Sequence, residues 1–141
     1  SFGHHDFTAG YLRRETFWNW ACFSTELDGE LIGMNVSRGV NETTWSENCL
    51  WYNNLLQNTS GVDFIFDRDD LFSPWNLRSV DQSINLVFHP VNEHQERLDA
   101  WVFASNFHQL FGYFSGEIVV DGRSIIIEKA WGFVEDQYAK W

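Results

Sequence analysis

Three titratable side chains lie where they could act on a small molecule. Glu47 lies between Trp45 and Trp51, His108 follows an aromatic residue, and Asp81 lies in a short polar break. A carboxyl group in a cavity lined by rings loses its hydration, which would raise the pKa of Glu47 and let it act as a general acid toward an alkene or a carbonyl. His108 or Asp81 would then be its partner.

Structural roles also explain these residues. His108 could be a histidine held by hydrogen bonds within a strand, as polar strand residues commonly are. Glu47 could instead belong to an ion-pair network with a basic side chain: Arg13, Arg14 or Arg38. The two interpretations differ in where Glu47 lies, because the catalytic one requires a buried carboxyl group.

A second set of residues combines large rings with polar groups and suits contacts with a ligand. Rings supply contact area, and a few polar groups fix the orientation of a bound molecule. A buried unpaired amide costs on the order of 1–3 kcal/mol, so each needs a partner in the protein or in a ligand. The ligand-binding candidates are Trp18, Asn19, Trp20, Asn35, Glu47, Trp75 and Gln109. The alternative is that Trp18, Trp20 and Trp75 belong to the core.

Other kinds of chemistry lack a recognisable pattern. The sequence has no Gly-x-Ser-x-Gly motif and no Gly-rich phosphate loop, and neither cysteine has a histidine close by. The histidines at residues 4 and 5 lack converging partners, and the acidic run at residues 67–70 lacks the glycine bend of a calcium loop. We therefore predict no metal and no cofactor, and favour a binding role over catalysis.

The elements that must position these residues are β-strands. The segment 107–127 places Asp121-Gly122 between two apolar runs, which is among the strongest hairpin signals because a type I′ turn needs positive φ at both central residues. Asp28-Gly29 predicts a second hairpin. Residues 17–24 are apolar on both faces, as in a barrel wall covered inside and outside.

Further short strands follow from the spacing of apolar residues, at 31–40, 45–52, 55–56, 62–66, 76–80, 83–88 and 98–103. Gly33 predicts a bend or bulge, Pro90 the end of a strand, and residues 92–96 a loop or helical turn. At the end of the chain, residues 128–141 fit a short helix, or an extended segment kept open by Gly132. The count is eight to ten strands, which predicts an all-β, antiparallel up-and-down barrel of the lipocalin or calycin kind.

Composition narrows the partners. The chain has 141 residues, a net charge of −11 and 18% aromatic residues, which fits one domain that repels nucleic acids and anionic membranes. No apolar run approaches the roughly 18 residues of a membrane span. Cys22 and Cys49 fit buried apolar positions, with a single bridge as the alternative, and a cytoplasmic location is favoured. Because the chain starts at Ser1, we expect a fragment of a longer protein.

Several stretches resemble an uncharacterised bacterial family that is known only as a domain of unknown function. They are WNWA from Trp18, IGMN from Ile32, SENCLW from Ser46, PWNLRSVDQSINLVFHP from Pro74, FGYFSGEIVVDG from Phe111 and GFVEDQYAKW from Gly132. They occur in order along nearly the whole chain. The family in turn is distantly similar to the carotenoid 1,2-hydratase and Diels–Alderase group of lipocalin-like proteins, through Gly10, Tyr11, Arg14, Trp18 and Trp20.

The resemblance to that group implies paired barrels, so this chain would be the C-terminal barrel and its N-terminal partner domain would be missing. Three functions follow, in order of preference. The first is binding of a small hydrophobic or amphipathic molecule in a barrel cavity. The second is a cofactor-independent hydratase, isomerase or cyclase that acts on an apolar substrate. The third is carbohydrate binding through exposed tryptophans.

Overall fold

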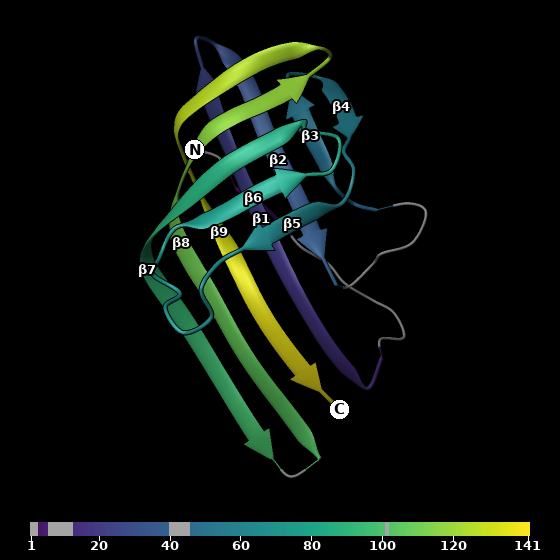
Figure 1. Cartoon of the computed structure of the whole chain (residues 1–141), viewed down its shortest axis with the longest axis vertical. Helices are drawn as coiled ribbons and strands as arrows, with labels where there is room; N and C mark the ends of the chain where they lie inside the picture. The colour runs from purple at the N-terminus through teal and green to yellow at the C-terminus, as the bar shows by residue number, and fades with distance from the viewer. Residues whose placement is uncertain (1–2, 6–12, 40–45, 101) are drawn as a thin grey trace.

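Nine antiparallel strands form a single sheet in the computed structural model, which describes residues 3–5, 13–39, 46–100 and 102–141 (Figure 1). The strands are β1 (Glu15–Leu27), β2 (Glu30–Arg38), β3 (Cys49–Tyr52), β4 (Leu55–Asn58), β5 (Val62–Ile65), β6 (Trp75–Ser79), β7 (Ile84–Ala100), β8 (Phe103–Val120) and β9 (Arg123–Lys140). The described residues contain no helix, so the all-β prediction is confirmed.

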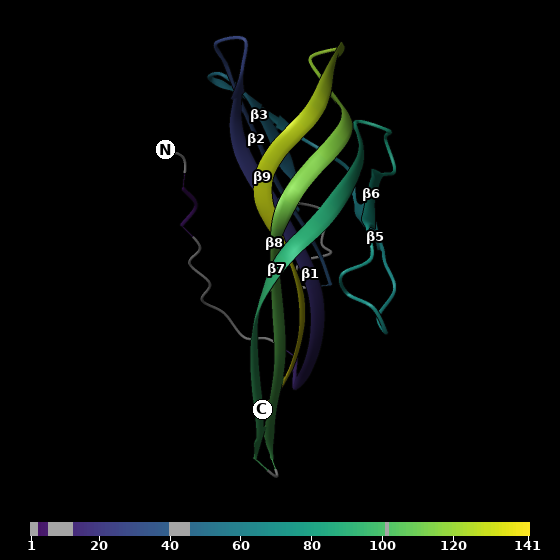
Figure 2. The ribbon, with the colours of Figure 1, turned by 90° about the vertical axis from the view of Figure 1, so that its left-hand side faces the viewer.

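The order of strands is that of an up-and-down meander with the ends of the chain in the middle. It runs β4-β3-β2-β1-β9-β8-β7-β6-β5, so β1 pairs with β9, and the edges β4 and β5 follow each other in the chain. The sheet curls until these edges approach, which brings β2 against β5. Figure 2 shows β5 and β6 standing on one side of the curled sheet. This half-barrel is consistent with the predicted up-and-down barrel.

Both predicted Asp-Gly hairpins are confirmed. Asp28 and Gly29 have φ of 51° and 82°, and Asp121 and Gly122 have φ of 52° and 70°. Positive φ at both central residues is the requirement of a type I′ turn, whose twist matches that of the strands it joins. The second turn links β8 to β9, whose pairing continues from Val120 and Arg123 to Ala104 and Lys140.

The prediction of a C-terminal helix is wrong, because β9 runs to Lys140. Val134 and Tyr138 are four residues apart, which places them on one face of a helix but equally on one face of a strand. In the sheet, Val134 pairs with Leu110 and Tyr138 with Asn106. The extended alternative that we associated with Gly132 is the one found.

Two predicted interruptions are also wrong. Pro90 and residues 92–96 lie inside β7, which passes through a register shift between Pro90 and Asn92 and continues to Ala100. A bulge is a standard place for a proline within a sheet, since the local ladder is already disrupted. Gly33 pairs regularly with Ser24, and its missing side chain leaves room for the Trp51 ring.

The inner face of the curled sheet carries the core. Alternate residues of each strand point inward, and the buried ones form one continuous cluster. Full burial of such side chains contributes roughly 1.5–3 kcal/mol each. The largest fully buried members include Phe23, Met34, Leu50, Trp75, Leu77, Leu86, Phe88, Leu110 and Phe114.

Side-chain contacts tie the β4–β5 connection to the β6–β7 turn and join β2 to the edge strand β5. The amide of Ser60, between β4 and β5, donates to Asp81 Oδ2 at 3.1 Å, and the amide of Asp81 donates to Ser60 Oγ at 2.9 Å. Asp81 Oδ1 also accepts hydrogen bonds from Ser83. An ion pair of 2.5 Å between Arg38 and Asp63 joins β2 to β5.

Candidate functional site

Four strands extend beyond the packed core and expose their inner face. In the lower half of Figure 1, β7, β8, β9 and β1 continue past the shorter strands. The last row packed in the core contains Leu110, Val134 and Ala21 in register. The next rows along the same face are polar and aromatic. Together with Glu93, which is opposite Leu110 at the end of the core row, they form what we call the lower inner surface. Its members are Phe17, Asn19, Glu93, Gln95, Arg97, Asn106, His108, Asp136 and Tyr138.

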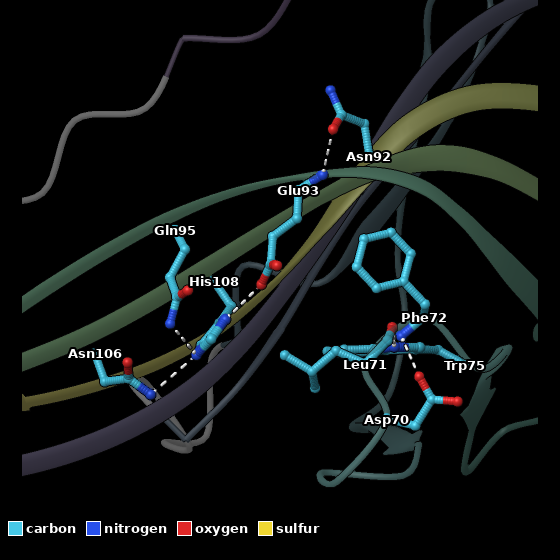
Figure 3. A network of polar contacts seen from close by, with 9 residues as sticks. All are labelled: Asp70, Leu71, Phe72, Trp75, Asn92, Glu93, Gln95, Asn106 and His108. Atoms are coloured by element: carbon cyan, nitrogen blue, oxygen red, sulfur yellow. Dashed lines mark hydrogen bonds and ion pairs between the residues drawn. The ribbon is translucent and has the colours of Figure 1, made fainter.

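His108 is the centre of a hydrogen-bond network on this surface (Figure 3). Its Nδ1 lies 2.5 Å from Glu93 Oε1, and its Nε2 lies 3.0 Å from Asn106 Nδ2 and 3.5 Å from the amide nitrogen of Gln95. A carboxylate accepts hydrogen bonds and an amide nitrogen donates them, so Nδ1 carries the imidazole proton and Nε2 is the acceptor. The network therefore fixes both the orientation and the tautomer of His108.

Asp136 lies next to His108 in the sheet and connects this surface to the loop between β5 and β6. It is opposite His108 and Asn19 in register, and it accepts a hydrogen bond of 2.8 Å from Asn19 Nδ2. Arg68, in the loop, lies 3.6 Å from Asp136 Oδ1. This ion pair places the loop over the upper edge of the lower inner surface.

The loop itself is held by its own hydrogen bonds. Asp70 accepts bonds from the Phe72 amide and the Ser73 hydroxyl, and the Trp75 indole donates to Leu71 O at 3.0 Å. Phe72 stays 51% exposed. Figure 3 shows Leu71 and Phe72 on the side of the sheet to which the His108 network points. The loop thus adds apolar side chains beside a polar network.

The next row combines charge, amide and ring. Arg97, Asn106, Tyr138 and Phe17 are successive partners across β7, β8, β9 and β1. The rings of Phe17 and Tyr138 lie 4.6 Å apart, and Phe17 is 56% exposed. A hollow of about 290 Å³ opens beside Asn106 and Tyr138 and extends along the β7–β8 hairpin past Arg97 and Asp99. The row can receive a molecule that has both a polar and an apolar part.

Only Asn19 and His108, among the residues predicted from the sequence, lie on this lower inner surface. Trp18, Trp20, Asn35 and Gln109 have the opposite parity and lie on the outer face. Three of them form hydrogen bonds there: the Trp20 indole donates to Asn35 Oδ1 at 2.7 Å, and Gln109 donates to Glu135 Oε1 at 2.6 Å. The structure does not bring these residues together with His108.

The other predicted residues lie elsewhere. Trp75 is fully buried and stacks on Phe66 with ring centroids 3.6 Å apart, so it is a core residue. Glu47 is exposed, which removes the apolar surroundings that its proposed acid role required. Asp81 is committed to the turn: partial burial acts to raise its pKa, but hydrogen bonds from Ser79, Ser83 and Ser60 outweigh this and hold the pKa well below that of an ordinary aspartate.

Sequence reasoning missed Glu93, Arg68, Asn106, Asp136 and Tyr138. The signal that could have found three of them was parity. Counting by twos from the apolar Leu110 leads through His108 to Asn106, and counting from Val134 leads through Asp136 to Tyr138. Because we allowed a helix at the C-terminus, we did not recognise residues 134, 136 and 138 as one face of a strand. Arg68 could not be found in this way, because a loop position depends on how the β5–β6 hairpin folds over the sheet.

The two cysteines are buried on the outer face and form no disulfide with each other. Cys22 pairs with Asn35 and Asn35 with Cys49, so one strand separates the two thiols. Two inter-strand spacings amount to about 10 Å, which is too far for a disulfide. Burial, with a smaller contribution from Glu47, raises the pKa of the Cys49 thiol to about 11.

Among the described residues, no three His, Cys, Asp or Glu side chains form a group that could hold a metal ion. In the same residues we find no helix of the length and apolarity needed to cross a membrane.

These features define a class of protein: a curled, antiparallel half-barrel with a polar network on the exposed end of its inner face. The chain belongs to the family described as a domain of unknown function, DUF2804, whose model matches residues 1–141. A search of curated proteins found no match.

One similar solved structure is the 2.00 Å crystal structure of a candidate AttH protein from Nitrosomonas europaea. The TM-score is 0.54 at 12% sequence identity, and the similarity covers 90% of this chain and 51% of that one. At this identity the likeness shows a shared fold. The chain spans about half the length of that structure.

Proposed function

We propose that this protein binds a small amphipathic molecule on its lower inner surface. The observation that carries the proposal is the His108 network, which lies where the apolar core ends and an exposed, ring-bearing row begins. Polar groups held in one orientation beside apolar contact area are the usual composition of a small-molecule site. Phe17, Tyr138 and Phe72 would contact the apolar part of the molecule, and the network would contact its polar part.

The hydrogen bonds around His108 support a role in recognition. Glu93 holds the proton on Nδ1, so Nε2 offers an acceptor on the inner face, covered by the Asn106 amide. A ligand hydroxyl or N–H group could displace this amide and donate to Nε2. Because the imidazole ring of His108 is already held in place, binding would carry no further entropic cost of ordering that ring. Asn19, bonded to Asp136, would contribute a second polar group at the same level.

The same pair of residues favours a second candidate, acid–base catalysis without a cofactor. A histidine oriented by a carboxylate is a common arrangement of a general base. In such a catalytic site Glu93 would be the partner of His108. It replaces the two carboxylates that we predicted from the sequence, since Glu47 is exposed and the Asp81 carboxylate is hydrogen-bonded within its own turn. We also propose, from the sequence resemblance, that this chain is related to the carotenoid 1,2-hydratase group. We further propose that it is the C-terminal barrel of a longer protein.

Native mass spectrometry of protein gently extracted from its own cells tests the binding proposal. We expect a retained small molecule on the wild-type protein, less of it on Phe17→Ala, and the wild-type amount on the outer-face control Phe111→Ala. Equal retention by all three would contradict the proposed location.

The recovered molecule also separates the two candidates. Incubation with a trace of protein leaves it unchanged if the protein only binds it. A product that accumulates beyond one equivalent, and that His108→Gln abolishes, would establish catalysis.

A further inference from the structure

The lower inner surface includes one arginine, Arg97, that forms no ion pair with the residues that the structure describes. Among the described residues, the ion pairs of arginine and lysine are Arg38 with Asp63, Arg68 with Asp136 and Lys140 with Glu15. Arg97 forms none with a described side chain, although the chain has 20 acidic residues and 9 basic ones. An unpaired guanidinium beside a hollow, in a protein of net charge −11, is a position where a ligand can supply the missing anion.

The side chains in the row of Arg97 change from a charged group at one end to apolar rings at the other, as the two ends of an amphipathic anion do. The guanidinium on β7 is followed by the Asn106 amide on β8 and then by the rings of Tyr138 and Phe17 on β9 and β1. Three inter-strand spacings make the row about 14 Å long. A molecule lying across the strands would place its charged end at Arg97 and its apolar body on the paired rings.

We propose that the molecule bound here is an amphipathic carboxylate whose carboxylate is held by Arg97. This inference rests on the proposed function and adds the chemical class of the ligand. The guanidinium presents N–H groups in a planar fork that matches both oxygens of a carboxylate, which gives orientation as well as attraction.

Asp99 sets the strength of this interaction. It lies two residues from Arg97 on the same strand and the same face, and it lines the same hollow. Its carboxylate repels an incoming anion and competes for the guanidinium. A ligand therefore needs apolar contacts as well as charge, which excludes small inorganic anions as the preferred occupants.

A matched pair of competitors tests the inference. N-phenyl-1-naphthylamine, a neutral probe that fluoresces in apolar sites, is bound to the whole protein and displaced by dodecanoate or by 1-dodecanol. The two competitors share a chain and differ at the polar end. We expect dodecanoate to displace the probe at a lower concentration than dodecanol does.

Two variants assign the difference to Arg97. Arg97→Gln should weaken dodecanoate by roughly tenfold, the scale of one charged hydrogen bond on a partly exposed group, and change dodecanol by less than about twofold. Asp99→Asn should strengthen dodecanoate alone. Arg123→Gln, a basic residue over the Tyr52 ring, is the control and should change neither.

The outcomes distinguish the two proposals. If the probe binds but the two competitors act equally and Arg97→Gln alters neither, the carboxylate inference is overturned and the binding function stands. If the neutral probe does not bind at all, the proposed function fails and the inference fails with it.

Discussion

His108 and Glu93 are joined by a 2.5 Å hydrogen bond although neither is the direct partner of the other in the sheet. His108 is opposite Gln95, and Glu93 is opposite Leu110, so the bond runs diagonally from β8 to β7. The register shift after Pro90 determines which residues of the lower part of β7 face inward, and it therefore places Glu93 on the same face of the sheet as His108. The proposed site thus depends on a bulge more than 10 Å of strand away from its lowest row.

Glu93→Gln should destabilise the fold by about 1 kcal/mol, since it replaces a charged hydrogen bond between largely enclosed groups by a neutral one. The exposed side-chain fractions are 14% for His108 and 23% for Glu93. Urea unfolding measures the change. The control is Glu96→Gln, because Glu96 forms the same kind of pair with His94 at 3.1 Å but with exposed fractions of 54% and 72%.

Such an exposed pair contributes little, so the Glu96 variant should stay within about 0.5 kcal/mol of wild type. Nitrogen NMR shifts should still report the Nδ1-protonated form of His108 in the Glu93 variant, because the glutamine amide oxygen can accept the same hydrogen bond. Equal effects of the two substitutions on stability would contradict the enclosed geometry of the Glu93–His108 pair.

Asp81→Asn should destabilise the protein at neutral pH and matter less as the pH falls. The pKa of Asp81 is lower in the folded protein than in the unfolded chain, so its contribution is fully present above the unfolded value of about 3.9 and is lost as the pH falls toward the folded value. Unfolding midpoints of the wild type and variant should therefore differ by the same amount at pH 7 and pH 5, and the difference should have narrowed clearly at pH 2. Asp121→Asn should have almost no effect, since asparagine suits the same type I′ turn. A gap that stays constant down to pH 2 would refute the role given to Asp81.

Gly112→Ala should destabilise the fold by about 1–3 kcal/mol, the usual cost of overpacking. Gly112 pairs with Gly132 on the adjacent strands β8 and β9, next to the core rings of Phe88 and Phe114. A Cβ at Gly112 would lie 2.1 Å from His89 O and 2.7 Å from the Phe88 ring. Thermal unfolding measures the loss, and Gly61→Ala is the control because a Cβ there meets nothing within 4 Å. A Gly112 variant as stable as the Gly61 variant would show that the strands do not approach this closely.

Much of the fold could be predicted from the sequence, because the signals are local. The Asp-Gly turns require positive φ wherever they occur, and alternation identified most of the strands. The lower part of β7 was missed because residues 92–99 are almost all polar, so a strand exposed on both faces has no apolar period to reveal it. Its extended form comes from pairing with β8, which is tertiary information.

The candidate site was predicted only in part for the same reason. His108 and Asn19 stood out as polar residues within apolar strands. Their partners Glu93 and Asp136 lie 15 and 117 residues away along the chain, and only the register brings them together. Trp18 and Trp20 were predicted as ligand contacts because they are rings beside polar groups in an apolar strand, whereas strand parity places both on the outer face.

The most direct test of the binding proposal is titration of three proteins with N-phenyl-1-naphthylamine: wild type, Phe17→Ala and Phe111→Ala. The two phenylalanines are matched, since both are exposed strand residues, at 56% and 41%, but Phe17 faces inward and Phe111 outward. The account predicts that the wild type and Phe111→Ala bind the probe with the same affinity and that Phe17→Ala binds it several-fold more weakly. Loss of binding in Phe111→Ala with full binding in Phe17→Ala would place the site on the other face of the sheet and contradict the account.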